Sequence, residues 1–168
     1  MKKLFLILAI ICFASTFSSA QNKKAEKEAA AQAQFDKAVA AIDAKDFVIV
    51  VDTYESSDGT IGTNTDEANF LSYEREFVFL QGMIVASNSY TNKTTVDEFS
   101  KVVDKKGNIK IEMQVMGSAI TAKIEIFMKK GGNYADVIVI PTKGNTRRFS
   151  GEVIPRAEAK YYKRPNVV

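Results

Sequence analysis

Residues 109–128, which read IKIEMQVMGSAITAKIEIFM, decide the fold, because apolar and polar side chains alternate along two runs of this stretch. Successive side chains of a β-strand point to opposite faces, so each run predicts a strand with one buried and one solvated face. The Met116-Gly117-Ser118 sequence between the runs is typical of a tight turn. We therefore predict an antiparallel hairpin here.

Similar turn sequences follow one another through the rest of the chain and predict a meander of about eight antiparallel strands in residues 47–164. Eight strands form either a curled sheet or a small barrel, and the sequence leaves closure open. Residues 47–51 are apolar on both faces, which predicts a central strand or one covered by a helix. The other expected features are strands at 47–55, 70–73 and 77–81, a polar loop at 56–69, an irregular stretch at 87–93, and turns at 106–108, 116–118, 131–133 and 143–145.

The N-terminus has the three-part pattern of an export signal. Two lysines follow the first methionine, residues 4–13 are apolar and uncharged, and Ser18-Ser19-Ala20 supplies small residues before a cleavage site. We predict a cleaved signal peptide at residues 1–20, a mature chain that begins at Gln21, and a periplasmic or extracellular location. A membrane anchor would need roughly 20 consecutive apolar residues, whereas Ser15-Thr16 interrupts this run.

Removal of this signal changes the composition of the chain. The signal holds two of the 23 basic residues, none of the 20 acidic residues and the single cysteine, so the mature net charge is 21 − 20 = +1. Histidine is absent from the whole chain. Catalytic systems that need His or Cys, and zinc sites that need His, are therefore excluded. We expect a non-catalytic protein with no cofactor and no metal.

Residues 21–46 predict a helical segment in two parts. Residues 23–33 are Lys, Glu, Gln and Ala, which favour helix but offer no large apolar side chain for burial. Phe35, Val39 and Ile42 then form an apolar stripe at helical spacing. We expect the second part to dock on the β domain and the first part to project into solvent. A helix that captures a partner is the functional alternative.

Several segments of the β region occur in the same order as in a known family: NFLS at 69–72, FVFLQ at 77–81, KKGN at 105–108, MGS at 116–118 and FSGEVIP at 149–155. In these segments the chain resembles the domain of unknown function 4251 family, over about residues 47–163. The resemblance implies a small exported protein of the kind found in bacteria of the Bacteroides group. It implies no enzymatic activity and no site residues, because the shared segments are strands and turns.

Carboxylate pairs are the remaining basis for catalysis, as in a glycoside hydrolase. Glu74 and Glu76 flank a predicted hairpin turn, where charged side chains are solvated. Asp97 and Glu98 point to opposite faces of a strand and cannot address one substrate. A third group offers oxygen ligands for calcium but lacks the ligand spacing of the twelve-residue calcium loop. This group lies in the polar loop and consists of Asp58, Asn64, Asp66 and Glu67.

Charge is unevenly distributed along the chain. Residues 47–100 hold two basic and nine acidic groups (2 − 9 = −7), and residues 101–168 hold fourteen basic and six acidic groups (14 − 6 = +8). The basic pairs include Arg147-Arg148, yet the near-neutral mature chain argues against a nucleic-acid partner. Either barrel closure brings the two halves together, or a dipolar surface recognises an acidic envelope component or a second copy.

Two functional interpretations therefore remain for this exported protein. The first is a binding module whose barrel interior holds an apolar ligand. The interior lining would then be Ile111, Met113, Val115, Ile124, Ile126 and Met128, although small barrels commonly fill such positions as plain core. The second is an interaction or structural protein of the cell envelope that acts through its outer surface and N-terminal helix. We expect no transmembrane segment after signal cleavage, and the partner and oligomeric state stay open.

Overall fold

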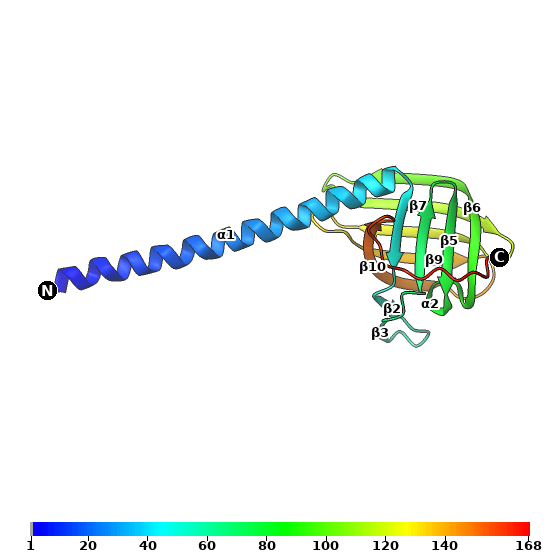
Figure 1. Cartoon of the computed structure of the whole chain (residues 1–168), viewed down its shortest axis with the longest axis horizontal. Coiled ribbons are helices and arrows are strands. Elements are labelled where there is room, and N and C mark those ends of the chain that lie inside the picture. The colour runs from blue at the N-terminus through cyan, green and yellow to red at the C-terminus, as the bar shows by residue number, and fades with distance from the viewer. Residues whose placement is uncertain (1) are drawn as a thin grey trace.

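A long helix and a closed antiparallel β-barrel make up the protein (Figure 1). The computed structural model describes the backbone from Lys2 and the side chains from Lys23, so the predicted signal peptide lies outside the described side chains. The elements are α1 (Lys2–Asp43), β1 (Asp46–Val50), β2 (Thr53–Glu55), β3 (Ile61–Thr63), β4 (Phe70–Glu74), β5 (Phe77–Gly82), α2 (Met83–Ala86), β6 (Asn88–Val103), β7 (Ile109–Gly117), β8 (Thr121–Met128), β9 (Tyr134–Pro141) and β10 (Arg147–Pro155).

Eight of the ten strands close the barrel in the order β1-β4-β5-β6-β7-β8-β9-β10. Closure is made by antiparallel pairing of β1 with β10, in which Val48 lies opposite Ile154. The short strands β2 and β3 form a hairpin that extends from β10 beside this seam. The prediction of an antiparallel meander of about eight strands with one N-terminal helix is confirmed, and the structure decides for a barrel. A closed barrel leaves no exposed strand edges among its own strands.

Three local predictions were wrong. The expected strand at 47–55 breaks into β1 and β2, and the expected loop at 56–69 contains β3. The expected irregular stretch at 87–93 is the start of β6, preceded by the unpredicted helix α2. The start of β6 lacks apolar alternation because buried polar side chains serve there instead: Asn92 donates to Leu80 O at 2.8 Å, and Thr94 donates to Val78 O at 2.7 Å.

The barrel has two distinct ends. β1 runs away from the C-terminus of α1, and β5 runs in the same direction because both strands are antiparallel to β4. Helix α2 follows β5 directly, so α1 and α2 lie at opposite ends (Figure 1). We call the end formed by α2, the β7–β8 turn at 118–120 and the β9–β10 loop at 142–146 the mouth.

Side chains fill the space between these two ends. The residues of α1 that dock are buried and belong to the same apolar cluster as the inward faces of the strands. At the mouth, Val85 and Ala86 of α2 belong to that cluster as well. The expected stripe therefore docks, but Val39 is only partly buried, and the buried face of α1 is formed by Phe35, Ala38, Ala41 and Ile42.

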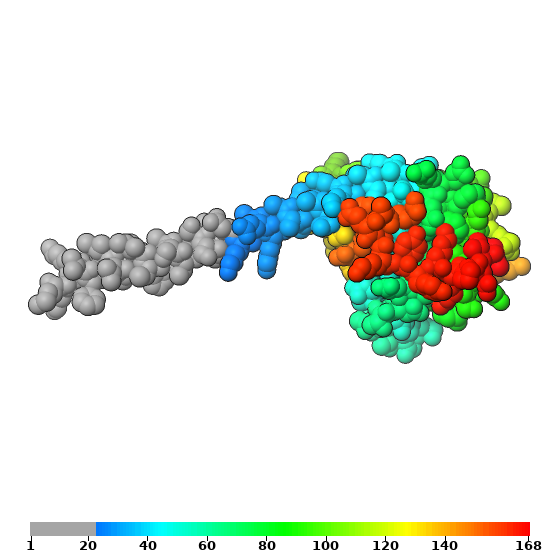
Figure 2. All heavy atoms as spheres, viewed as in Figure 1, coloured from blue at the N-terminus to red at the C-terminus, as the bar shows by residue number. Residues whose placement is uncertain are grey.

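The helix leaves the barrel before this docked segment. Residues 23–30 of α1 are exposed on every side, as the sequence predicted (Figure 2). Among the described residues, no helix is both long enough and apolar enough to cross a membrane. Residues 23–30 of α1 are therefore exposed to solvent, and the docked segment at 35–42 closes one end of the barrel.

The C-terminal tail, residues 156–168, crosses the outer face of the barrel (Figure 2). Tyr161 packs edge-on against Phe70 with ring centroids 4.8 Å apart, and Lys163 Nζ lies 3.1 Å from the ring centroid of Phe79. These contacts cover the outer face of β1, β4 and β5. Residues 47–51 are apolar on both faces because the tail, rather than a helix, covers them.

The tail also reduces the charge asymmetry of the chain. Arg156 Nε lies 2.5 Å from Asp46 Oδ1, and Lys163 Nζ lies 3.0 Å from Glu74 Oε1. Both acidic residues lie on strands of the N-terminal half of the barrel, and both basic residues come from the tail. Of the nine acidic residues in 47–100, Glu74 pairs with the tail and Glu55 pairs with Arg148.

Gln81 joins the tail to the barrel. Its side chain is completely buried, and its amide nitrogen donates to Ala68 O at 2.9 Å and to Tyr162 O at 2.7 Å. Its amide oxygen accepts from Arg164 N at 2.8 Å and from the Thr91 hydroxyl. The Gln81 side chain thus satisfies hydrogen-bonding groups of the loop before β4, of the C-terminal tail and of β6, because an amide has both donors and acceptors.

We expect Gln81→Leu to lower the free energy of unfolding by about 2–3 kcal/mol, because buried partners lose their hydrogen bonds without gaining water. The tail should also detach, which limited trypsin digestion after Lys160 would detect. Urea unfolding followed by circular dichroism measures the loss. Thr95→Val is the matched control, since it removes a hydroxyl that is exposed and bonds only Met116 O. An equal loss in both variants would contradict the role given to Gln81.

Candidate functional site

The six predicted lining residues all lie inside the barrel on β7 and β8. Each is at most 1% exposed, and all belong to the apolar cluster that includes the docked part of α1. None of them lines any of the hollows described below. In this structure the interior is occupied by the protein's own side chains.

The carboxylate candidates are engaged in local contacts or exposed. Glu74 accepts from the Ser72 hydroxyl at 2.8 Å and pairs with Lys163, while Glu76 is exposed. Asp97 and Glu98 are both exposed at a β-bulge in β6. Neither pair therefore faces a hollow across which two carboxylates could act on one bond.

The oxygen-rich loop uses its side chains to hold its own backbone. Asp58 accepts from the Ser56 hydroxyl at 2.6 Å and from Thr60 N at 3.1 Å, and these hydrogen bonds lower the pKa of Asp58. Asp66 accepts from Ala68 N at 2.9 Å. Among the residues whose side chains are described, no group of three or more acidic, His or Cys residues gathers as metal ligands would.

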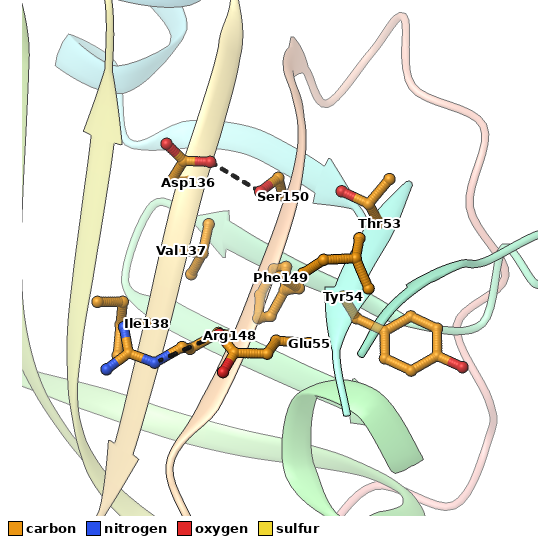
Figure 3. Close-up of a pocket in the computed structure, with 10 residues that line it drawn as sticks. Thr53, Tyr54, Glu55, Asp136, Val137, Ile138, Arg148, Phe149 and Ser150 are labelled. Atoms are coloured by element: carbon orange, nitrogen blue, oxygen red, sulfur yellow. Dashed lines mark hydrogen bonds and ion pairs between the residues drawn. The ribbon is translucent and has the colours of Figure 1, made fainter. Parts of the chain in front are cut away.

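One hollow lies between β2, β9 and β10, on the outside of the barrel (Figure 3). Its volume is about 230 Å³, and its polar groups are paired with one another. The Ser150 hydroxyl donates to Asp136 Oδ1 at 2.8 Å, and Arg148 Nε lies 3.8 Å from Glu55 Oε2. Each of its three charged residues therefore already has a partner in the chain.

A second hollow, which we call the mouth hollow, lies at the α2 end and has a volume of about 260 Å³. Its apolar side is formed by Val85, Ile120, Val139 and Pro141. Its basic side is formed by Lys143 and Arg147, on the β9–β10 loop and the start of β10. No acidic residue lines it.

Arg147 is held at the mouth by a single serine. Its Nε donates to Ser87 Oγ at 2.7 Å, and its Nη2 donates to the same oxygen. Ser87 ends α2 in the left-handed conformation, with φ 61° and ψ 18°, a region that costs a side-chain-bearing residue energy. The sequence named Arg147 only as part of a basic pair, because nothing local predicted α2 or Ser87 beside it.

Comparisons with known proteins agree with this architecture. The crystal structure of a DUF4251 family protein from Bacteroides eggerthii is similar, with a TM-score of 0.70 and 26% sequence identity. The similarity covers 79% of this chain and 94% of that chain. No functionally curated protein matches the sequence. Residues 29–153 match the family model described as domain of unknown function (DUF4251), and the chain therefore belongs to this family, as the resemblance in its strands and turns predicted.

Proposed function

We propose that the protein is an exported, non-catalytic binding module of the cell envelope that holds its ligand at the mouth of the barrel rather than in its interior. The observation that carries this proposal is the contrast between the two places. The interior is packed with side chains, whereas the mouth hollow combines an apolar side with two basic residues. Mouths of β-barrels are frequent positions for small-molecule sites.

The arrangement of α1 supports the same proposal. Its docked segment closes the end of the barrel opposite to α2, and its exposed segment runs away from that end (Figure 1). The mouth hollow consequently lies at the opposite end of the barrel from the docked segment of α1. The export part of the proposal rests on the sequence pattern of residues 1–20 and on the resemblance to exported proteins.

The second candidate function is an interaction protein that acts through α1. The exposed, Lys- and Glu-rich surface of residues 23–30 favours it, because this segment contributes nothing to the barrel. A module that binds through α1 would lose its partner when these residues are deleted. A module that binds at the mouth would keep its ligand.

Native mass spectrometry of the protein purified from its own host tests the first candidate. We expect a small-molecule adduct on the natural protein and on Met116→Trp, whose side chain lies on the outer face at 54% exposure. Ala119→Trp should lose the adduct, because Ala119 is exposed and lines the mouth hollow. The absence of an adduct from all three proteins, or an adduct equally retained by Ala119→Trp, would refute binding at the mouth.

The export part of the proposal has its own test. The intact mass of the protein in the envelope fraction should correspond to a chain that begins at Gln21.

A further inference from the structure

The two basic residues of the mouth hollow belong to the barrel cations that have no carboxylate partner among the described side chains, whereas several other cations are paired. Lys101, Arg156 and Lys163 each lie within salt-bridge distance of a carboxylate. Neither Lys143 nor Arg147 has a carboxylate within 4.0 Å among the described side chains, although Arg148, next in sequence, pairs with Glu55. Two positive charges therefore share one hollow with no acidic group from the chain.

The guanidinium of Arg147 presents two N–H groups on one edge. Both donate to the single oxygen of Ser87, which accepts them with its two lone pairs. A carboxylate has two oxygens at the spacing of the fork and forms the stronger, charge-assisted pair. The fork is thus held in position at the rim of the hollow, and its present acceptor is a neutral one.

The apolar side of the hollow selects the rest of the ligand. Ile120 and Pro141 are partly exposed and offer this apolar surface, while the lining residues Val85 and Val139 are completely buried. A hydrated anion such as phosphate gains nothing from this surface, whereas an alkyl chain gains free energy from each methylene that it removes from water. The size of the hollow, about 260 Å³, limits the ligand to a short chain.

We infer that the mouth hollow binds a small aliphatic carboxylate, with its carboxylate on Arg147 and Lys143 and its alkyl chain against Ile120 and Pro141. The inference deepens the proposed function and rests on the mouth being the binding site. The ligand displaces the Ser87 hydroxyl from the fork, and Ser87 can then donate its own hydrogen to the bound carboxylate.

Titration calorimetry with octanoate tests this inference, using the protein purified from its own host and dialysed to remove retained ligand. We expect octanoate to bind at least tenfold more tightly than acetate, which lacks the chain, and than octylammonium, which has the opposite charge. Inorganic phosphate should bind no better than acetate. Hydrogen exchange should slow at residues 84–87 and 143–147 on octanoate binding.

Arg147→Gln should weaken octanoate binding by roughly tenfold or more, because a charge-assisted pair is lost. Arg148→Gln is the matched control, since the next side chain in the strand points to the other face, and its effect should stay below about twofold. Equal weakening by both variants, equal binding of octylammonium, or protection elsewhere would overturn the inference. If octanoate does not bind, but native mass spectrometry shows a host-derived adduct that Ala119→Trp loses, the inferred ligand class is wrong and binding at the mouth is retained.

Discussion

Gly151→Ala is expected to lower the free energy of unfolding by about 3 kcal/mol or more. Gly151 lies on β10 beside the seam with β1. A Cβ atom there would lie 2.1 Å from Val50 O and 3.2 Å from Ile49 Cγ2. Because Val50 O is a backbone atom of the strand that closes the barrel, relief requires the seam itself to move. Urea unfolding followed by far-ultraviolet circular dichroism would measure the loss.

Gly132→Ala provides the matched control for this substitution. Gly132 lies in the β8–β9 turn, its φ is not positive, and no atom beyond its chain neighbours lies within 4 Å of the added methyl position. We expect a change within about 0.5 kcal/mol. A similar loss in both variants would mean that the effect at Gly151 reflects glycine's flexibility rather than contact across the seam.

Ile42→Ala should have the second largest effect, a loss of about 3–4 kcal/mol in the free energy of unfolding. The Ile42 side chain is completely buried where α1 closes the barrel, so truncation leaves a cavity that rigid strands cannot fill. The same urea unfolding measurement applies. Hydrogen exchange should also quicken in the docked segment of α1.

Lys37→Ala is the control for the docked helix. Lys37 lies on the same helix but is exposed, and its Nζ pairs with Glu158 Oε2 at 3.1 Å. Exposed pairs contribute little, so we expect a loss below about 1 kcal/mol. If Ile42→Ala cost no more than Lys37→Ala, α1 would not be an integral part of the core.

The strands that the sequence predicted best are those whose burial is decided locally. β7 and β8 alternate strictly because one face meets the core and the other meets water along their whole length. The same holds for the docked stripe of α1, whose spacing follows from helix geometry alone. The ends of these strands were harder to predict. Gly117 was expected in the turn at 116–118, but it is the last residue of β7 and its φ is not positive. A Cβ atom at Gly117 would lie 2.6 Å from Lys93 O, so close packing explains the glycine.

The features that were not predicted from the sequence depend on contacts with residues far away in the chain. Thr91, Asn92 and Gln81 are polar yet buried, and only contacts with the tail and with β5 explain this burial. Helix α2 is a single turn, too short for a periodic pattern. Arg147 and Arg148 are identical neighbours in the sequence, and only the fold distinguishes the residue at the mouth from the residue that pairs with Glu55.

Closure of the barrel by β1 and β10 has a consequence for how the protein is made. These are the first and last strands of the barrel in chain order, so the seam cannot form until synthesis has delivered nearly the whole chain. Pairing between segments so distant in sequence is also slow, because a long loop must be ordered first. Until β10 arrives, every partial chain has two open strand edges. Barrel closure is therefore a late step of folding, which follows the synthesis of β10.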